Sequence, residues 1–164
     1  MLRIASAVIV SACTAVAFAP LASADPTPGN FVNVQISSPR MRCEIGSDDD
    51  SGVPGVRGMG PNVVCQTAGF PQAPMNPAPY PGWPGDPLVL HQDQAIITAS
   101  GQFSWRTANL GTAPPGQPDT NVANGQRYHL QGWTVVPTSD GVTFTDDATG
   151  HGMLISSDYS VKPF

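Results

Sequence analysis

Apolar residues along this chain fall in short runs that alternate with polar residues and end at turn-forming residues. Residues 31–36 (FVNVQI) show the pattern clearly. A period of two residues is typical of a strand that buries one face. Similar runs follow at 41–45, 63–67, 95–98, 103–106, 128–135, 142–145, 153–155 and 159–161. Because no window offers a sustained helical period, the pattern predicts an all-β fold.

Turn chemistry adds one hairpin to this prediction. The run at 128–135 leads into Pro137, and Ser139-Asp140-Gly141 supplies a turn before the run at 142–145. Aspartate and glycine are favoured in such turns, so these two runs are expected to pair. Residues 88–90 and 95–98 flank a polar tetrad that suits either a short helix or two strands, and their β-branched residues favour strands.

Between Phe70 and Leu88 the chain becomes rich in proline, with Tyr80 and Trp83 interleaved. Prolines repeat every three residues in two stretches of 71–87, a spacing that aligns them along one edge of a polyproline II helix. The segment therefore suits either a groove-binding ligand or a stiff crossover with its aromatic rings packed on the sheet. A second loose stretch, 110–125, is expected to be a loop.

Composition limits the fold further. The chain has 164 residues, 17 glycines, 18 prolines, 7 basic residues and 12 acidic ones. This balance excludes a coiled coil, a collagen and a nucleic-acid binder, and the length allows one domain. The sequence therefore predicts a small, disulfide-stapled β-sandwich or barrel-like antiparallel sheet with long loops rich in proline and glycine.

Residues 1–24 have the features of a secretory signal peptide. Arg3 precedes an apolar run, and Ala22-Ser23-Ala24 forms a small-residue cleavage site. Val10-Ser11-Ala12-Cys13 also fits a lipoprotein acylation pattern, but the apolar run continues past Cys13, so a lipid anchor there is not favoured. Cleavage after Ala24 leaves one secreted domain, 25–164, with no membrane span. Its six basic and twelve acidic residues give a net charge of −6, which does not favour anionic lipid or nucleic acid.

The exported chain keeps two cysteines, Cys43 and Cys65, each within an alternating run. An even pair in an oxidising compartment predicts a disulfide. Closing a loop of about 23 residues stabilises a fold by about 3.4 kcal/mol, because it lowers the entropy of the unfolded chain. A redox-active pair would need a closer spacing, such as Cys-x-x-Cys.

No strong metal or cofactor motif occurs. Asp48, Asp49 and Asp50 are weak calcium candidates, since Ca²⁺ takes carboxylate oxygens. The alternating acidic pattern of a calcium-binding loop is absent, and a solvated acidic loop is the simpler interpretation. The three histidines lack zinc-site spacing. We therefore expect no cofactor.

His151 is the most interesting catalytic candidate, because glycines flank it and allow the backbone to aim its side chain. Asp147 could orient the ring in a small hydrolase. The alternative is a glycine-rich hairpin turn between Phe144 and Met153, with His151 half exposed. No Gly-x-Ser-x-Gly, phosphate-binding or dinucleotide-binding motif accompanies it.

Three segments together resemble a known group: residues 37–45 (SSPRMRCEI), Cys65 in a valine-rich run, and residues 149–156 (TGHGMLIS). The chain resembles small exported proteins of mycobacteria and related actinobacteria, whose function is unknown. The resemblance implies a signal peptide, a disulfide, a β-rich body and a location in the cell envelope or outside the cell. Arg40-Met41-Arg42 departs from the commoner Ser-Gly-Asn-Ile at that point, and no catalytic residues come with the group.

These observations favour an exported, non-enzymatic binding module of the cell envelope or extracellular space. Tyr80, Trp83 and His151 are the expected contacts with an unknown partner, because exposed loops on a rigid scaffold carry most binding. The alternative is a small secreted hydrolase that acts on an envelope polymer, with His151 as its base.

Overall fold

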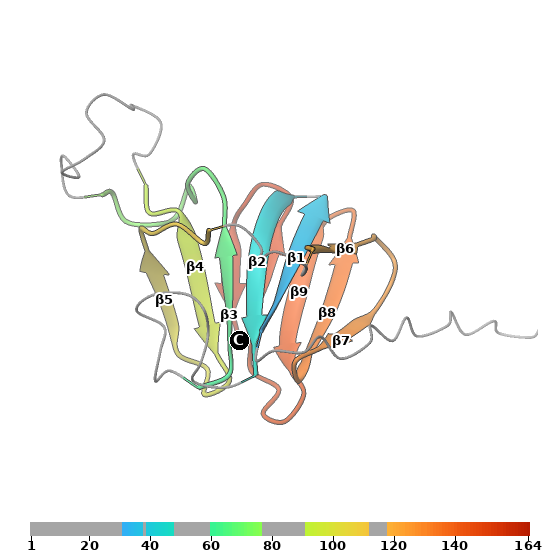
Figure 1. Cartoon of the computed structure of the whole chain (residues 1–164). Coiled ribbons are helices and arrows are strands. Elements are labelled where there is room, and N and C mark those ends of the chain that lie inside the picture. Colours follow the sequence, from blue (N-terminus) through green and yellow to red (C-terminus); the bar gives the residue numbers. More distant parts are fainter. Residues whose placement is uncertain (1–30, 38, 48–59, 77–90, 112–117) are drawn as a thin grey trace, which may run out of the picture.

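The computed structural model describes residues 31–37, 39–47, 60–76, 91–111 and 118–164 (Figure 1). The predicted signal peptide, 1–24, lies outside the described residues. The described ranges contain strands and no helix, so none of their elements is a helix that could cross a membrane. The strands are β1 Phe31–Ser37, β2 Arg40–Gly46, β3 Asn62–Gln66, β4 Gln94–Thr98, β5 Phe103–Arg106, β6 Thr120–Val122, β7 Tyr128–Leu130, β8 Trp133–Thr138, β9 Gly141–Asp146, β10 Gly152–Ser156 and β11 Val161–Pro163.

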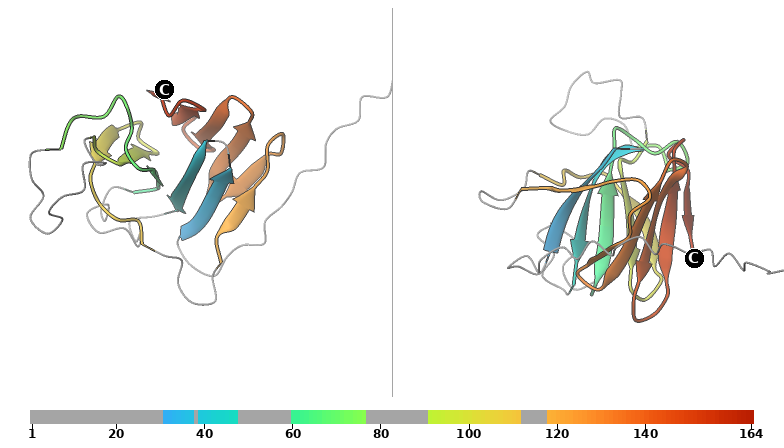
Figure 2. Two further views of the ribbon diagram at one scale, coloured as in Figure 1. Left: turned by 90° about the horizontal axis from the view of Figure 1, so that it is seen from above. Right: turned by 90° about the vertical axis from the view of Figure 1, so that its right-hand side faces the viewer.

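The strands form two sheets that face each other as the layers of a small sandwich (Figures 1 and 2). The first sheet has the order β5-β4-β3-β2-β1-β6, and the second has the order β11-β10-β9-β8-β7. All neighbours are antiparallel except β1 and β6, which run parallel. The all-β prediction and the sandwich are therefore confirmed.

The core lies between the two sheets and is built by the alternation seen in the sequence. Successive side chains of a strand point to opposite faces, so one apolar set from each strand turns inward. Trp133 and Phe144 of the second sheet are completely buried. They share one cluster with residues of the first sheet that include Val34, Ile36, Ile45, Val63 and Ile97.

Cys43 and Cys65 form the predicted disulfide. They face each other directly in the register of β2 and β3, with their Cα atoms 4.1 Å apart, and both are completely buried. The bond closes a sequence separation of 22 residues. The expected stapled hairpin is therefore confirmed, while 48–59, which contains Asp48, Asp49 and Asp50, lies outside the described residues.

The predicted hairpin at 139–141 is also confirmed, since Thr138 pairs with Gly141 around Ser139 and Asp140. The single run predicted at 128–135 is wrong. A two-residue turn at Gln131 (φ 52°) and Gly132 (φ 81°) divides it into β7 and β8. Positive φ at both central positions is the geometry that joins antiparallel strands tightly, and Gln131 gives little sign of it in the sequence.

Two further segments differ from expectation. The stretch 110–125, expected to be a loop, contains β6, whose Thr120 and Val122 pair in parallel with Val34 and Ile36. A strand of three residues is too short to show a period. The last strand begins at Val161 rather than at Tyr159, because Tyr159 adopts a φ of 65° and belongs to the preceding turn.

Candidate functional site

A row of long polar side chains crosses the outer face of the first sheet; most of its members are partly exposed, and Gln94 is completely buried. We call these side chains the polar row. Its members stand on six neighbouring strands and face one another in register: Asn121, Gln35, Arg42, Gln66, Gln94 and Arg106. Each alternates with core residues along its strand, so the row points away from the second sheet. Pairing across strands, rather than order along the chain, brings these residues together.

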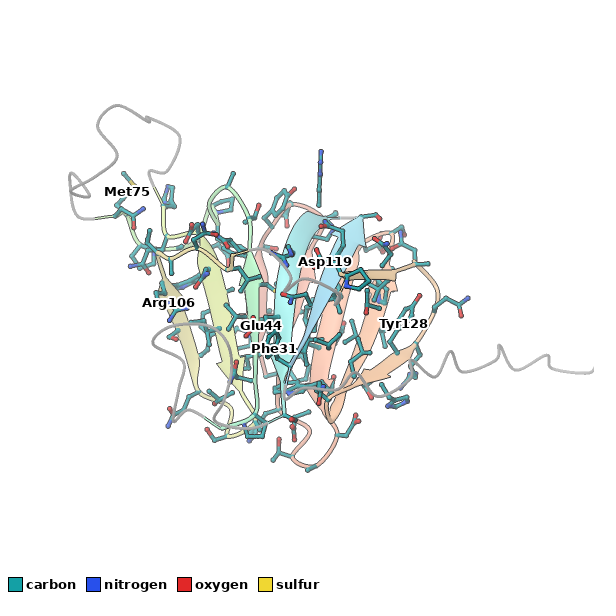
Figure 3. The ribbon with its side chains drawn as sticks, viewed as in Figure 1. Phe31, Glu44, Met75, Arg106, Asp119 and Tyr128 are labelled. Atoms are coloured by element: carbon teal, nitrogen blue, oxygen red, sulfur yellow. A yellow bond between two sulfur atoms is a disulfide. The ribbon has the colours of Figure 1, made fainter. Side chains whose placement is uncertain are left out.

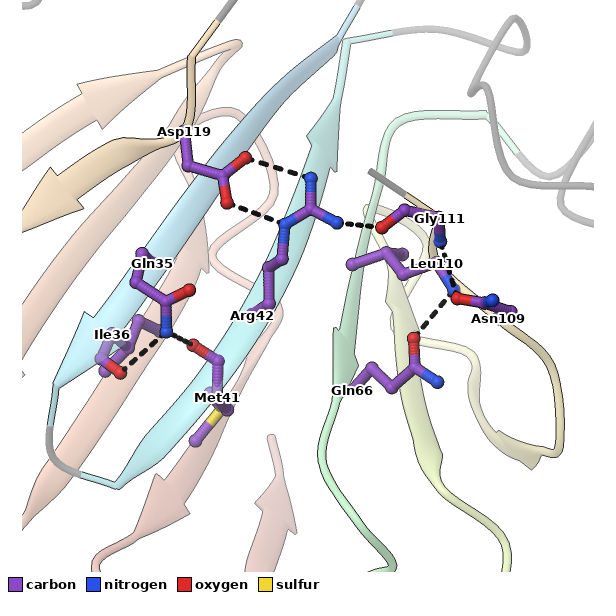
Figure 4. A network of polar contacts seen from close by, with 9 residues as sticks. All are labelled: Gln35, Ile36, Met41, Arg42, Gln66, Asn109, Leu110, Gly111 and Asp119. Atoms are coloured by element: carbon purple, nitrogen blue, oxygen red, sulfur yellow. Dashed lines mark hydrogen bonds and ion pairs between the residues drawn. The ribbon is translucent and has the colours of Figure 1, made fainter. Parts of the chain in front are cut away.

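Arg42 is the centre of one part of the row (Figure 4). Its guanidinium donates two hydrogen bonds to Asp119, from Nε to Oδ2 at 2.7 Å and from Nη2 to Oδ1 at 2.9 Å. Nη1 donates to the carbonyl of Gly111. A bidentate arginine–carboxylate pair fixes direction as well as distance. Arg42 therefore holds the chain on both sides of residues 112–117.

Gln66 binds the segment that returns from β5 across the sheet, residues 107–111, which we call the strap. Its Nε2 donates to the carbonyl of Ala108 at 2.8 Å, and its Oε1 accepts from the backbone N–H of Leu110 at 2.7 Å. Leu110 in turn packs on Val64 and Ile96, two buried apolar residues on this outer face. One glutamine thus satisfies two backbone groups and fixes the strap over an apolar patch.

Charged groups continue the row at β4 and β5. Arg106 donates from Nε and Nη2 to Oε1 of Gln94, at 3.0 and 2.8 Å. Burial lowers the pKa of Arg106, and the negative charges of Asp93 and Glu44 oppose that shift. Glu44, the only glutamate of the chain, is 4% exposed, and Figure 3 marks it with Arg106 over this sheet.

Asp93 lies immediately before β4 and joins the strap to the row. Its Oδ1 accepts from the N–H of Ala108 at 3.2 Å, and its Oδ2 accepts from Gln66 at 3.1 Å. Burial raises the pKa of Asp93, while these two hydrogen bonds and the charge of Arg106 act in the opposite direction. Perturbed ionisable groups cluster at functional sites, although ion-pair networks perturb them too.

The same end of the sheet also holds both flanks of residues 77–90. Met75 and His91 form an antiparallel bridge, and Asn76 donates from Nδ2 to the carbonyl of His91 at 3.2 Å. His91 donates from Nδ1 to the carbonyl of Ala73, at 2.6 Å. Tyr80 and Trp83 lie outside the described residues, and their part in binding stays a prediction.

His151 lies exposed in the turn between β9 and β10, as the hairpin interpretation expects. A Cβ placed on Gly101 would meet the His151 ring at 2.9 Å, so the ring lies directly over that glycine. Thr149 of the same turn donates to the carbonyl of Ala99 at 2.7 Å. The β9–β10 turn therefore ties the second sheet to the β4–β5 turn of the first.

Asp147 contacts a different histidine. Its carboxylate accepts a hydrogen bond from the hydroxyl of Thr134 and lies 3.4 Å from Nδ1 of His129. Thr134 Oγ1 is 3.1 Å from the same Nδ1. Because the hydroxyl donates to the carboxylate, it accepts from the ring, and Nδ1 carries the proton. An arrangement for nucleophilic attack needs the opposite direction, with a ring nitrogen that accepts the hydroxyl proton.

The described residues contain no group of three or more histidine, cysteine or acidic residues placed to hold a metal ion. Comparison with known proteins gives no match: no family model fits the chain, and no curated protein or solved structure is similar to it. The geometry of this chain therefore carries the functional argument alone.

Proposed function

We propose that this protein is an exported, non-enzymatic binding module of the cell envelope or extracellular space. Its contact surface is the end of the first sheet that carries the polar row. The observation that supports this proposal most is that two segments have both of their flanks held at this end of the sheet. Arg42 holds both flanks of 112–117, and the Met75–His91 bridge holds both flanks of 77–90. Anchored flanks on a rigid sheet are what loop-based recognition requires.

Register shows that the two anchors belong to one end of the sheet. Arg42 pairs with Gln66, and Gln66 pairs with Gln94, which follows His91 by three residues. The flanks of 48–59 emerge at the opposite end, where Gly46 pairs with Asn62. The described flanks of 77–90 and of 112–117 thus lie at the end of the sheet that carries the polar row.

The composition of 77–90 suits recognition. It combines prolines with Tyr80 and Trp83, and proline-rich segments bind at little cost in conformational entropy. Aromatic side chains supply large contact areas and dominate binding energies. The leader-like residues 1–24 and the buried disulfide support export, because disulfides persist in oxidising compartments.

The alternative, a hydrolase with His151 as base and Asp147 as its orienting group, lacks a supporting contact. Asp147 is engaged by Thr134 and His129, and the His151 ring lies on Gly101. If envelope-polymer hydrolysis were measurable, a His151→Ala variant should retain it. Loss of hydrolysis in that variant, with the fold intact, would restore the hydrolase.

The binding proposal is tested by affinity recovery from envelope extract. The variants are wild type, the double variant Tyr80→Ala/Trp83→Ala, and Lys162→Gln as a control on the second sheet. The double variant should lose the partners that wild type and the control recover, while all three keep the same thermal unfolding midpoint. Equal recovery by all three forms would contradict the proposed contact surface.

A further inference from the structure

The two sheets end in four edge strands, and β5 differs from the other three. On β11, the N–H of Val161 is bonded to Gln72 at 3.0 Å, and Pro163 has no N–H. The strands β6 and β7 have three residues each. Blocked and short edges are the usual protection against edge-to-edge pairing. The strand β5 is the longest of the four edge strands, with four residues, and it contains no proline.

The hydrogen-bond pattern shows which groups β5 presents at its open edge. Thr98 donates to the carbonyl of Gln102 at 3.0 Å, which makes these two a hydrogen-bonded pair. Bonded and non-bonded pairs alternate in antiparallel strands, so Ile96 bonds with Ser104, while Phe103 and Trp105 direct their N–H and C=O groups away from β4. Among the described residues, no hydrogen bond reaches those four groups.

The side chains at this edge are apolar on the core side. Phe103 and Trp105 pack on the core while remaining partly exposed. Their rings form a T-shaped pair with centroids 4.9 Å apart, and Phe70 lies 5.2 Å from Trp105. The core therefore continues to the edge of the sheet and ends there on two incompletely covered aromatic rings. A further strand would bond the outward-facing backbone groups of Phe103 and Trp105 and cover both rings.

We propose that this strand is β5 of a second copy of the chain, paired antiparallel about a twofold axis at Ser104. In that register Phe103 of each copy faces Trp105 of the other, and the four outward-facing backbone groups of each copy are all bonded. Aromatic residues face one another directly, a favourable cross-strand pair. The register also places Arg106 opposite Gln102 of the second copy, so the two arginines do not meet.

A second copy fits this edge because the edge is self-complementary. A twofold interface needs each surface to match itself, and the spacing of Phe103 and Trp105 around Ser104 does so. The two six-stranded sheets would then form one continuous sheet. This inference does not rest on the proposed function, because it is argued from the edge of β5 and its test positions, Ser104 and Gln102, lie outside the polar row.

Disulfide crosslinking tests the register directly. Ser104→Cys places two thiols opposite each other at the axis, in a non-bonded pair whose Cα separation suits a disulfide. Gln102→Cys, the matched control, places its thiol opposite Arg106. Oxidation should yield covalent dimer from Ser104→Cys and little from Gln102→Cys. Equal crosslinking of the two variants, or none from Ser104→Cys, would overturn the proposal.

Analytical ultracentrifugation of charge variants at position 102 gives a second measurement of dimerisation. Gln102 is exposed, so these substitutions should leave the fold intact. Gln102→Glu faces Arg106 of the second copy and should tighten dimerisation, whereas Gln102→Lys should weaken it, each by about fivefold over the two symmetric pairs. A wild-type chain that stays monomeric at all concentrations, or charge variants without opposite effects, would refute the pairing.

Discussion

Removing the Cys43–Cys65 disulfide should destabilise the fold by about 3 kcal/mol. The bond closes a sequence separation of 22 residues, and the chain-entropy relation gives about 3.4 kcal/mol for a loop of that length. The native sheet does not depend on the bond for its register. The β2–β3 ladder continues on both sides of the cysteines, from Arg42 with Gln66 to Gly46 with Asn62. The loss should therefore come mainly from the freed unfolded chain.

The assay is urea unfolding of residues 25–164, comparing the oxidised protein with the double variant Cys43→Ala/Cys65→Ala. The variant should keep its β-sheet circular dichroism and lose about 3 kcal/mol of unfolding free energy. The single variant Cys43→Ala also breaks the bond but truncates only one buried side chain. Its difference from the double variant therefore measures the cost of the lost buried volume. A loss below about 1 kcal/mol in the double variant would refute the reasoning, because cross-linking would then constrain the unfolded chain very little.

Three other perturbations test contacts of the described residues. In a double-mutant cycle, Arg42→Lys and Asp119→Asn should show about 1 kcal/mol of coupling in unfolding free energy, because lysine cannot form the bidentate pair; independent effects would contradict this pair. Gly101→Ala should cost about 1–2 kcal/mol, because its φ is 81° and the His151 ring lies over it, and the cost should fall in a His151→Ala background; an unchanged cost would show that the ring contributes nothing. The pKa of Asp93 is raised on folding, so the folded state binds the extra proton, and this group's contribution to stability falls as pH rises from the ordinary aspartate pKa through the raised one. Urea titrations across acidic pH should therefore show the unfolding free energy of Asp93→Asn rising relative to that of wild type as pH rises. A fall in that difference with rising pH would contradict the raised pKa.

Much of the fold was predictable because it follows from local pattern. Alternation marks the strands that bury one face, and Ser139-Asp140-Gly141 marks a hairpin turn. The cysteines predict their own bond because only two remain after the predicted leader. These signals depend on residues that lie close together in the sequence or on a very small set of partners.

The features that the sequence did not reveal depend on how strands far apart in the chain are aligned with one another. The polar row unites Arg42 with Gln66 and Arg106 only after four strands, β2 to β5, have been aligned. A parallel strand as short as β6 carries no period of its own. The flanking glycines correctly drew attention to the turn at His151. They could not show that its ring would lie on Gly101 or that Asp147 would turn to His129.

The proposed contact surface is tested most directly by site-specific photo-crosslinking in envelope extract. A photoreactive phenylalanine analogue replaces Trp83, within the segment held by the Met75–His91 bridge, or Lys162, on β11 of the second sheet. The account predicts a discrete crosslinked partner from position 83 and none from position 162. Crosslinking from position 162 alone, or the same products from both positions, would contradict it.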